Sequence, residues 1–239
     1  MANNYFQFKQ FKIFQDKAAM KVGTDGVLLG AWVDLSEVRN VLDVGTGTGI
    51  IALMMAQRHV SANITAIDID SEAYVQATEN FLISPWNGRL TAFNQSIQSF
   101  GQNREGLYDL VVCNPPFFQN SFKSANSSRN LARHTDSLSA DELICNAFLL
   151  SSENARLAVV VPEEQAEQFI ELCHKNFYNL VRSLCVKPNM TKPAKRRLLE
   201  FKKHFRGDSQ EKEISIETTA RHFYSNEYKE LTKEFYLAF

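Results

Sequence analysis

"NVLDVGTGTGIIALMMAQR", residues 40–58, decides the fold class of this chain. It begins as an apolar strand that runs into a glycine-rich turn, and residues 50–58 then form an apolar segment typical of a helix. A buried strand joined to a helix by a short glycine turn is how a parallel βαβ unit begins. The stretch therefore predicts the start of an α/β sheet.

The same alternation of strand and helix continues to about residue 187. Further strands are predicted at residues 63–70, 90–93, 108–114, 155–162 and 180–188, and helices at residues 71–81, 139–150 and 163–176. Long helices between strands predict a doubly wound, mostly parallel sheet. The strand expected at residues 196–205 follows its predecessor without a helix, so we expect an antiparallel strand at the edge of the sheet.

A short N-terminal extension, residues 1–35, precedes this sheet. "FKIFQDKAAMKVGTDG", residues 11–26, predicts a short strand or hairpin and a turn, after which a helix begins that Thr24 or Asp25 could cap. We see no linker and no internal repeat. We therefore expect a single domain over residues 1–239, with the extension packed on a Rossmann-like core at residues 36–239.

The composition narrows the class of protein. The chain is 44% hydrophobic with a formal net charge of -1, so its global charge does not favour nucleic acid. The four cysteines form no CxxC pair, so we expect core thiols and no metal site. The N-terminus lacks the apolar region of a signal peptide, and no apolar run of about 18 residues exists. We expect a cytoplasmic protein, with no membrane and no obligate protein partner.

The glycine loop predicts a ligand site. Gly45, Gly47 and Gly49 lack Cβ, so a ligand can approach the backbone around Thr46 closely. In open α/β sheets, ligands bind at the carboxyl ends of the strands. The pattern here is GxGxG, whereas the dinucleotide fingerprint is GxGxxG.

Acidic residues next to the loop indicate which ligand it takes. Asp43 would repel a pyrophosphate and would suit a cation, such as the ammonium or sulfonium of S-adenosylmethionine. Asp68 can accept hydrogen bonds from both ribose hydroxyls, a feature that NAD sites share. Asp70 is expected to cap the next helix instead.

The stretch "NPPF", residues 114–117, ends the predicted strand 108–114. Prolines alone could simply stop a strand. Next to the glycine loop, however, the Asn114 side chain and the Pro115 carbonyl could each accept an N–H from an exocyclic amine, and the prolines would hold both acceptors rigidly. Phe117 could stack on a planar base. The motif therefore predicts methylation of a planar amine.

These motifs resemble those of the class I S-adenosylmethionine-dependent methyltransferases, in element order over residues 40–187. The NPPF motif is similar to the (N/D)PP(Y/F/W) motif of enzymes that methylate adenine N6, guanine N2 or glutamine amides. In that family an acid after the third strand often holds the adenine amine of the cofactor. Ser96 stands at about this position here, and it can donate or accept a hydrogen bond but carries no charge.

A narrower resemblance, to the bacterial tRNA(Val) adenine-37 N6-methyltransferase family, covers nearly the whole chain. It rests on "KAAMKVGTDGVLLGAW", residues 17–32, and on "LDVGTGTGIIALMMAQR", "NPPFF", "ARH", "RRLLEF" and "YKELTKEFYL". The part "KVGTDGVLLGAW" of the first stretch discriminates best, because glutamine methyltransferases carry a helical N-terminal domain that this chain lacks. The resemblance implies methyl transfer to N6 of the adenosine just 3′ of the anticodon, and it places Thr24 near the cofactor.

Local charge favours an RNA partner. Residues 187–206 contain one acid and eight bases, which are Lys187, Lys192, Lys195, Arg196, Arg197, Lys202, Lys203 and Arg206. The polar loop at residues 122–134 adds further basic side chains. Although a solvated edge strand carrying lysines would have the same composition, we expect both segments to contact the anticodon loop of a tRNA.

Other functions remain open from the residues alone. A guanine-N2 methyltransferase of ribosomal RNA or a protein glutamine N5-methyltransferase would use the same site. A non-catalytic RNA-binding module would need only the basic segments, and its activity would survive loss of Asn114. An NAD-linked oxidoreductase fits least, because of the loop spacing and Asp43.

Overall fold

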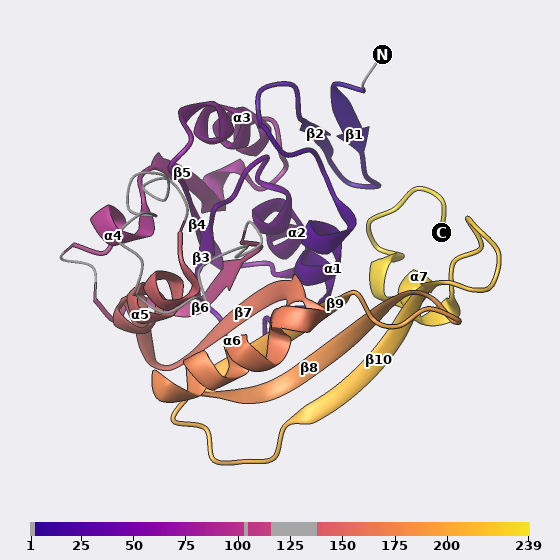
Figure 1. The fold of residues 1–239 in the computed structure, drawn as a ribbon. Coiled ribbons are helices and arrows are strands. Elements are labelled where there is room, and N and C mark those ends of the chain that lie inside the picture. Colours follow the sequence, from indigo (N-terminus) through magenta and orange to yellow (C-terminus); the bar gives the residue numbers. More distant parts are fainter. Residues whose placement is uncertain (1–2, 103–104, 116–137) are drawn as a thin grey trace, which may run out of the picture.

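A computed structural model describes residues 3–102, 105–115 and 138–239 (Figure 1). Within these residues a central eight-stranded sheet is covered by helices on both faces. Its strands lie in the order β10-β8-β9-β7-β6-β3-β4-β5. Their bounds are β3 Asn40–Val44, β4 Asn63–Asp68, β5 Leu90–Asn94, β6 Tyr108–Cys113, β7 Ser151–Pro162, β8 Tyr178–Asn189, β9 Arg196–Lys203 and β10 Gln210–Glu217.

The predicted doubly wound, mostly parallel sheet is confirmed, with one correction. Every neighbouring pair is parallel except the two that β9 makes with β7 and β8. We expected the antiparallel strand at the edge, but β9 lies inside the sheet and β10 forms the edge. The reason is that β8 and β9 enter as a hairpin whose second strand pairs with β7, which leaves β8 free to add β10 on its other side.

The helices divide between the two faces of the sheet. Residues of α1 Thr24–Trp32, α2 Ile50–Arg58, α3 Ser71–Leu82 and α7 Asn226–Thr232 share one core. Residues of α4 Ile97–Phe100, α5 Ala140–Leu150 and α6 Glu163–Lys175 share the other. A one-turn 3-10 helix, η1 Asn87–Arg89, leads into β5.

The sequence of β3 explains why both faces are covered. Successive side chains of a strand point to opposite faces. Val41 accordingly packs in the first core, whereas Leu42 and Val44 pack in the second. A strand whose apolar side chains point to both faces therefore needs helices on both sides.

The N-terminal extension forms the predicted hairpin, from β1 Tyr5–Gln7 and β2 Lys12–Phe14. Its rings join aromatic side chains of the C-terminal segment, because Phe8 lies 5.8 Å from Tyr236 between ring centroids. The Lys9 amide also donates to the Phe235 carbonyl at 2.8 Å. Residues far apart in the sequence thus hold each other on one side of the sheet (Figure 1).

The start of α1 differs from the prediction. Gly23, in extended conformation, occupies the N-cap and supplies no side-chain bond, so neither Thr24 nor Asp25 caps the helix. Both residues already lie inside the first turn, where a side chain cannot reach the free amides as a cap does. Asp25 instead accepts a hydrogen bond of 2.8 Å from Arg196 on β9.

Within the described residues, no helix is both long enough and apolar enough to span a bilayer. The four cysteines are free thiols, of which Cys113 and Cys173 are buried.

Candidate active site

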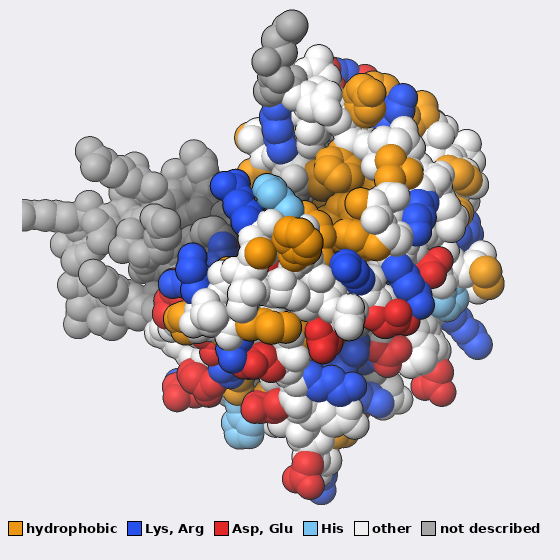
Figure 2. All heavy atoms as spheres, turned by 90° about the vertical axis from the view of Figure 1, so that its right-hand side faces the viewer, with side chains coloured by type: hydrophobic (Ala, Val, Ile, Leu, Met, Phe, Trp, Pro, Cys, Tyr) orange, Lys and Arg blue, Asp and Glu red, His pale blue; other side chains and the backbone are white. Residues whose placement is uncertain are grey.

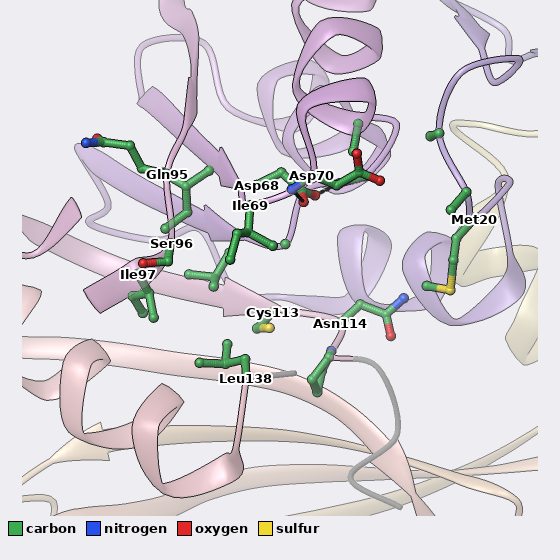
Figure 3. A pocket seen from close by; sticks show the side chains of 18 of the residues that line it. Met20, Asp68, Ile69, Asp70, Gln95, Ser96, Ile97, Cys113, Asn114 and Leu138 are labelled. Atoms are coloured by element: carbon green, nitrogen blue, oxygen red, sulfur yellow. Dashed lines mark hydrogen bonds between the residues drawn. The ribbon is translucent and has the colours of Figure 1, made fainter. Parts of the chain in front are cut away.

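A cavity of about 590 Å³ opens at the carboxyl ends of β3, β4 and β6 (Figure 3). These ends meet because the three strands are parallel neighbours. The cavity lies where ligands bind in open α/β sheets. Its wall includes the glycine loop after β3, the ends of β4 and β6, and the turn after β5.

The glycine loop presents bare backbone to this cavity. Gly45 and Gly47 line it, with φ of +68° and +56°. A Cβ built on either residue would meet no protein atom within 4 Å, so it would project into space that a ligand can use. Only glycine adopts these angles without strain. The loop is fixed from behind, because the Gly45 amide donates to the Ile67 carbonyl at 2.9 Å.

Two other predicted residues shape the loop and do not line the cavity. Gly49 is the N-cap of α2 with φ of +83°, and a Cβ there would lie 2.5 Å from the ring of Phe81. Thr46 is buried, and its hydroxyl donates to Asp43 at 2.6 Å. The structure thus places both behind the bare backbone that faces the cavity.

Asp43 is fully buried behind the loop. One of its oxygens accepts the Thr46 hydroxyl, while Oδ1 accepts no hydrogen bond of ordinary geometry from the described residues. Burial raises the pKa of Asp43 to about 7, the Thr46 bond opposes this rise, and the charge of Asp68 adds to it. The site therefore holds a buried carboxyl group that titrates near neutral pH.

Asp68 lines the cavity at the end of β4. Its Oδ2 accepts the Gly47 amide at 2.8 Å and its Oδ1 accepts the Asp70 amide at 3.0 Å, so it ties the glycine loop to the start of α3. Burial raises the pKa of Asp68, and these amide bonds oppose the rise. Asp70 caps α3 as predicted, since its side chain accepts the Glu72 amide at 2.9 Å.

Asn114 and Pro115 follow the last residue of β6 and line the cavity. Because β6 pairs with β3, they lie beside the glycine loop, as expected. Figure 3 shows no hydrogen bond between the Asn114 carboxamide and the other drawn residues. Phe117 and the loop at residues 122–134 lie outside the described residues.

Ser96 and Thr24 have different places. Ser96 lines the cavity and is the N-cap of α4, where its hydroxyl accepts the Ser99 amide at 3.2 Å. Thr24 is exposed at the start of α1 and is absent from the cavity wall. The neighbouring turn of α1 does approach the site, because a Cβ on Gly26 would lie 3.9 Å from Asn114 Nδ2.

One wall of the cavity was not among the residues predicted from the sequence. Ala18, Ala19 and Met20, in the loop between β2 and α1, line it, and Met20 is 61% exposed (Figure 3). The loop is clamped at its ends, where Gln15 Oε1 accepts the Val22 amide at 3.0 Å and Gln76 Oε1 accepts the Lys17 amide at 2.9 Å. These residues lie in the stretch at residues 17–32 that carries the family resemblance, but small and apolar side chains form no chemical motif that would place them in the wall of a site.

Other missed residues lie after β5 and at the start of α5. Gln95, Ile97 and Gln98 flank Ser96 in the wall, and Ile69 of the β4–α3 turn is a further apolar side chain there, 65% exposed. Leu138 and Glu142 complete this side. A search of the described residues finds no group of three His, Cys, Asp or Glu side chains that could hold a metal ion.

Comparison with known proteins gives the family. Residues 18–142 match the model of the methyltransferase small domain. A tRNA1(Val) (adenine(37)-N6)-methyltransferase of Flavobacterium psychrophilum is 46% identical over 97% of this chain and 99% of its own. One of Trichodesmium erythraeum, with the same name, is 45% identical over 100% of both chains. The chain belongs to the tRNA1(Val) (adenine(37)-N6)-methyltransferase family.

Solved structures of low sequence identity share the fold of this chain. A predicted O-methyltransferase from Agrobacterium tumefaciens has a TM-score of 0.69 at 15% identity, covering 88% of this chain and 96% of its own. TYW2 of Pyrococcus horikoshii, solved in complex with MeSAdo, has a TM-score of 0.58 at 17% identity. The match covers 84% of this chain and 71% of its own.

The residues of the cavity fit S-adenosylmethionine, the methyl donor that a methyltransferase of this family implies. The bare backbone at Gly45 and Gly47 allows close approach. Asp43 Oδ1 is a buried carboxylate oxygen without a normal hydrogen bond from the described residues, and Asp68 lines the cavity itself, so both favour a cation. Ile69 and Ile97 give apolar surface for a planar ring.

Proposed function

We propose that this chain transfers a methyl group from S-adenosylmethionine to N6 of adenosine 37, next to the anticodon, in a valine tRNA. Relatives that carry this activity in their names match it at 42–46% identity over nearly its whole length. The observation that carries the proposal is local. Asn114 and Pro115, two acceptors for an amine, lie beside a glycine loop whose backbone is open to a ligand.

The acceptors at the end of β6 would position the amine. The exocyclic N6 of adenine is a poor nucleophile, because its lone pair is delocalised into the ring. Hydrogen bonds from its two N–H groups to the Asn114 side-chain oxygen and the Pro115 carbonyl would favour a more tetrahedral nitrogen, with its lone pair directed at the methyl donor. Bound S-adenosylmethionine supplies an electrophilic methyl group on a sulfonium.

The proline at 115 holds these acceptors in place before the base arrives. Pro115 is buried and has a fixed φ, so the acceptors lose little freedom on binding. No base is needed in the methyl-transfer step, because the amine proton can leave afterwards. Phe117 would supply a face for the adenine to stack on.

For the cofactor, we propose a division of labour among the predicted residues. Gly45, Gly47 and Asp68 would contact it, and Ser96 would lie near its adenine between Ile69 and Ile97. Thr46 and Gly49, behind the cavity wall, would hold the glycine loop in its conformation. Asp43, also behind the wall, would attract the cationic cofactor by its negative charge. Thr24 would act only through the first turn of α1, because it lies outside the cavity wall.

For the RNA, we propose contacts from residues 187–206 and from residues 122–134. Part of the first segment is occupied by ion pairs within the protein. Lys187 pairs with Glu213, Arg196 with Asp25, and Arg197 with Glu163 and Glu167. A cytoplasmic location would place the enzyme with its substrate.

The test is methyl transfer from labelled S-adenosylmethionine to unmodified total tRNA, followed by nucleoside digestion and mass spectrometry. N6-methyladenosine confined to a valine tRNA supports the proposal down to its substrate. A methylated guanosine would keep the amine chemistry but give the site to the guanine-N2 alternative. Label in protein with none in tRNA would favour glutamine methylation, and no label anywhere would favour a non-catalytic RNA-binding module.

A further inference from the structure

The basic segment at residues 187–206 runs from one end of the strands of the sheet to the other. It forms the end of β8, a turn and β9. Arg196, at the start of β9, pairs with Pro162 at the carboxyl end of β7, whereas Lys203 pairs with Tyr178 at the amino end of β8. The turn at residues 190–195 therefore lies at the end of the strands where the cavity opens. Lys202 and Arg206 lie toward the opposite end of the strands.

A second turn leaves the sheet beside the first. Strand β10 is parallel to β8, and Glu217 at its end pairs with Asn189. The turn at residues 218–224 follows and is closed by the Thr218 amide, which donates to the Phe223 carbonyl at 2.7 Å. Its side chains Arg221, His222 and Phe223 are exposed, and Phe223 is 67% exposed. The two turns thus present side chains together although they lie far apart in the sequence.

The turn at residues 190–195 is equally well fixed. The Asn189 side-chain oxygen accepts the amides of Thr191 and Lys192, both at 3.1 Å. Met190, Lys192 and Lys195 are exposed. A turn that is held by its own backbone loses little freedom when a ligand binds its side chains.

Nearby acids do not neutralise this surface. Asp25 and Glu213 are already paired with Arg196 and Lys187, and Glu217, between the two turns, accepts the His222 amide at 2.8 Å. No ion pair within 4.0 Å joins Lys192, Lys195 or Arg221 to an acid among the described residues. Figure 2 shows the side of the molecule where α7 lies and β8 and β10 end. Acidic side chains gather mostly in its lower part, where basic ones lie among them, and in its upper part basic side chains lie among exposed apolar ones.

We infer that, within residues 187–206, only the turn at residues 190–195 contacts the RNA, and that together with the turn at residues 218–224 it forms the surface that binds the RNA backbone next to the target base. Four strand spacings separate β6, which ends at the site, from β10, and this corresponds to about 19 Å. That distance spans several nucleotides of an RNA arm, so phosphates can reach Lys192, Lys195 and Arg221 while the target base lies at Asn114. Phe223 offers a ring for an unpaired base. The inference rests on the proposed tRNA substrate.

The test compares two double variants that each remove two positive charges from the same segment. Lys192→Gln/Lys195→Gln changes the turn, and Lys202→Gln/Arg206→Gln changes the opposite end of the segment. Fluorescence anisotropy of an unmodified valine tRNA transcript gives the affinity at several salt concentrations, and methyl transfer gives kcat and KM. We expect the turn variant to bind about tenfold more weakly at physiological salt, with a salt slope lower by about 1.5. Its kcat and cofactor affinity stay at the wild-type level.

A third variant tests the aromatic ring. Phe223→Ala should weaken binding about fivefold or more without changing the salt slope, because stacking releases no counterions. The inference is overturned if the turn variant binds tRNA as tightly as the wild type does. It is also overturned if Lys202→Gln/Arg206→Gln loses as much tRNA affinity as the turn variant. If the wild-type enzyme binds and methylates no tRNA, the proposed function itself fails, which is a separate result.

Discussion

Asn114 lies in the cavity wall, and no hydrogen bond joins its carboxamide to the other residues drawn there. Asp68 and Ser96 of the same wall are bound within the protein, Asp68 to the loop amide and Ser96 to its own helix. Of these three side chains, that of Asn114 is the one most available to a ligand.

The first prediction concerns this residue. Asn114→Ala should lower kcat on the order of 10²–10³-fold, since it removes one preorganised acceptor from the reacting amine. Cofactor affinity should remain within about twofold, measured by calorimetry. Asn87→Ala, in the exposed turn before β5, is the control and should keep full activity. Full activity of the Asn114 variant would exclude the proposed amine contact.

Met20 supports a second prediction. Its exposed side chain is part of the cavity wall from the N-terminal loop and is drawn on the same side as Asn114 (Figure 3). We expect the adenine to pack against this flexible thioether. Met20→Ala should raise KM for tRNA about threefold to tenfold and leave cofactor affinity unchanged. Met190, which is 56% exposed, lies outside the cavity but within the proposed RNA surface, so the control is Val60→Ala, after α2. An unchanged KM would remove Met20 from base binding.

Asp43 supports a prediction on pH. Its folded-state pKa is about 7 and its ordinary value is 3.8, so the folded protein binds the proton more tightly. The free energy of unfolding should therefore fall as pH rises from about 4 to about 7, by at most about 4 kcal/mol from this group. Asp43→Asn should flatten this fall, measured by urea unfolding of the cofactor-free protein. Asp208→Asn, at an exposed site, should leave it unchanged, and equal slopes in wild type and Asp43→Asn would contradict the assignment.

The sequence could predict the site only where backbone constraint or strand order carries the information. Glycine spacing identified Gly45 and Gly47, and strand order placed Asn114 beside them. The part of the wall at Met20 could not be predicted, because it depends on how hydrogen bonds to Gln15 and Gln76 fix a loop of small residues. The placement of Thr46 and Gly49 behind the cavity wall could not be predicted, because a residue in a ligand loop can face either the ligand or the core.

At the scale of elements, the N-terminus of the helix that follows the glycine loop packs against the Phe81 side chain of α3. A Cβ at Gly49 would meet Phe81 at 2.5 Å, and φ there is +83°. Gly49→Ala should therefore destabilise the protein by about 3 kcal/mol, from strain and overpacking. Gly88→Ala, where a Cβ meets nothing within 4 Å, should cost less than about 0.5 kcal/mol. Urea unfolding measures both, and equal values would show that the helices move apart freely.

Most elements could be predicted from their periodicity, since strands and helices of the core differ in length and pattern. The position of β9 could not. A strand hairpin can add to a sheet by either strand, and the choice depends on which one packs best against β7. Leu198, Leu199 and Phe201 of β9 are fully buried, which favours the inner position for this strand.

At the scale of the whole molecule, we propose that residues 1–239 unfold as one domain. The N-terminal hairpin joins α3 through Asn80, which bonds the Phe14 amide and carbonyl, and it joins the C-terminal segment at Phe235. Fluorescence of Trp32 and Trp86, both in the first half of the chain, should therefore change at the same urea concentration as far-UV circular dichroism. An earlier fluorescence transition would mean that the N-terminal half unfolds separately.

The inner position of β9 has a consequence for synthesis on the ribosome. Strand β8 leaves the ribosome before β9, yet β9 is the strand that joins β8 to the rest of the sheet. Until residue 203 has emerged, β7 has an unpaired edge, which is a template for pairing with another chain. A nascent chain that has emerged from the ribosome only to about residue 190 should therefore be prone to aggregation. Once residues up to 203 have also emerged, the hairpin can cover that edge of β7.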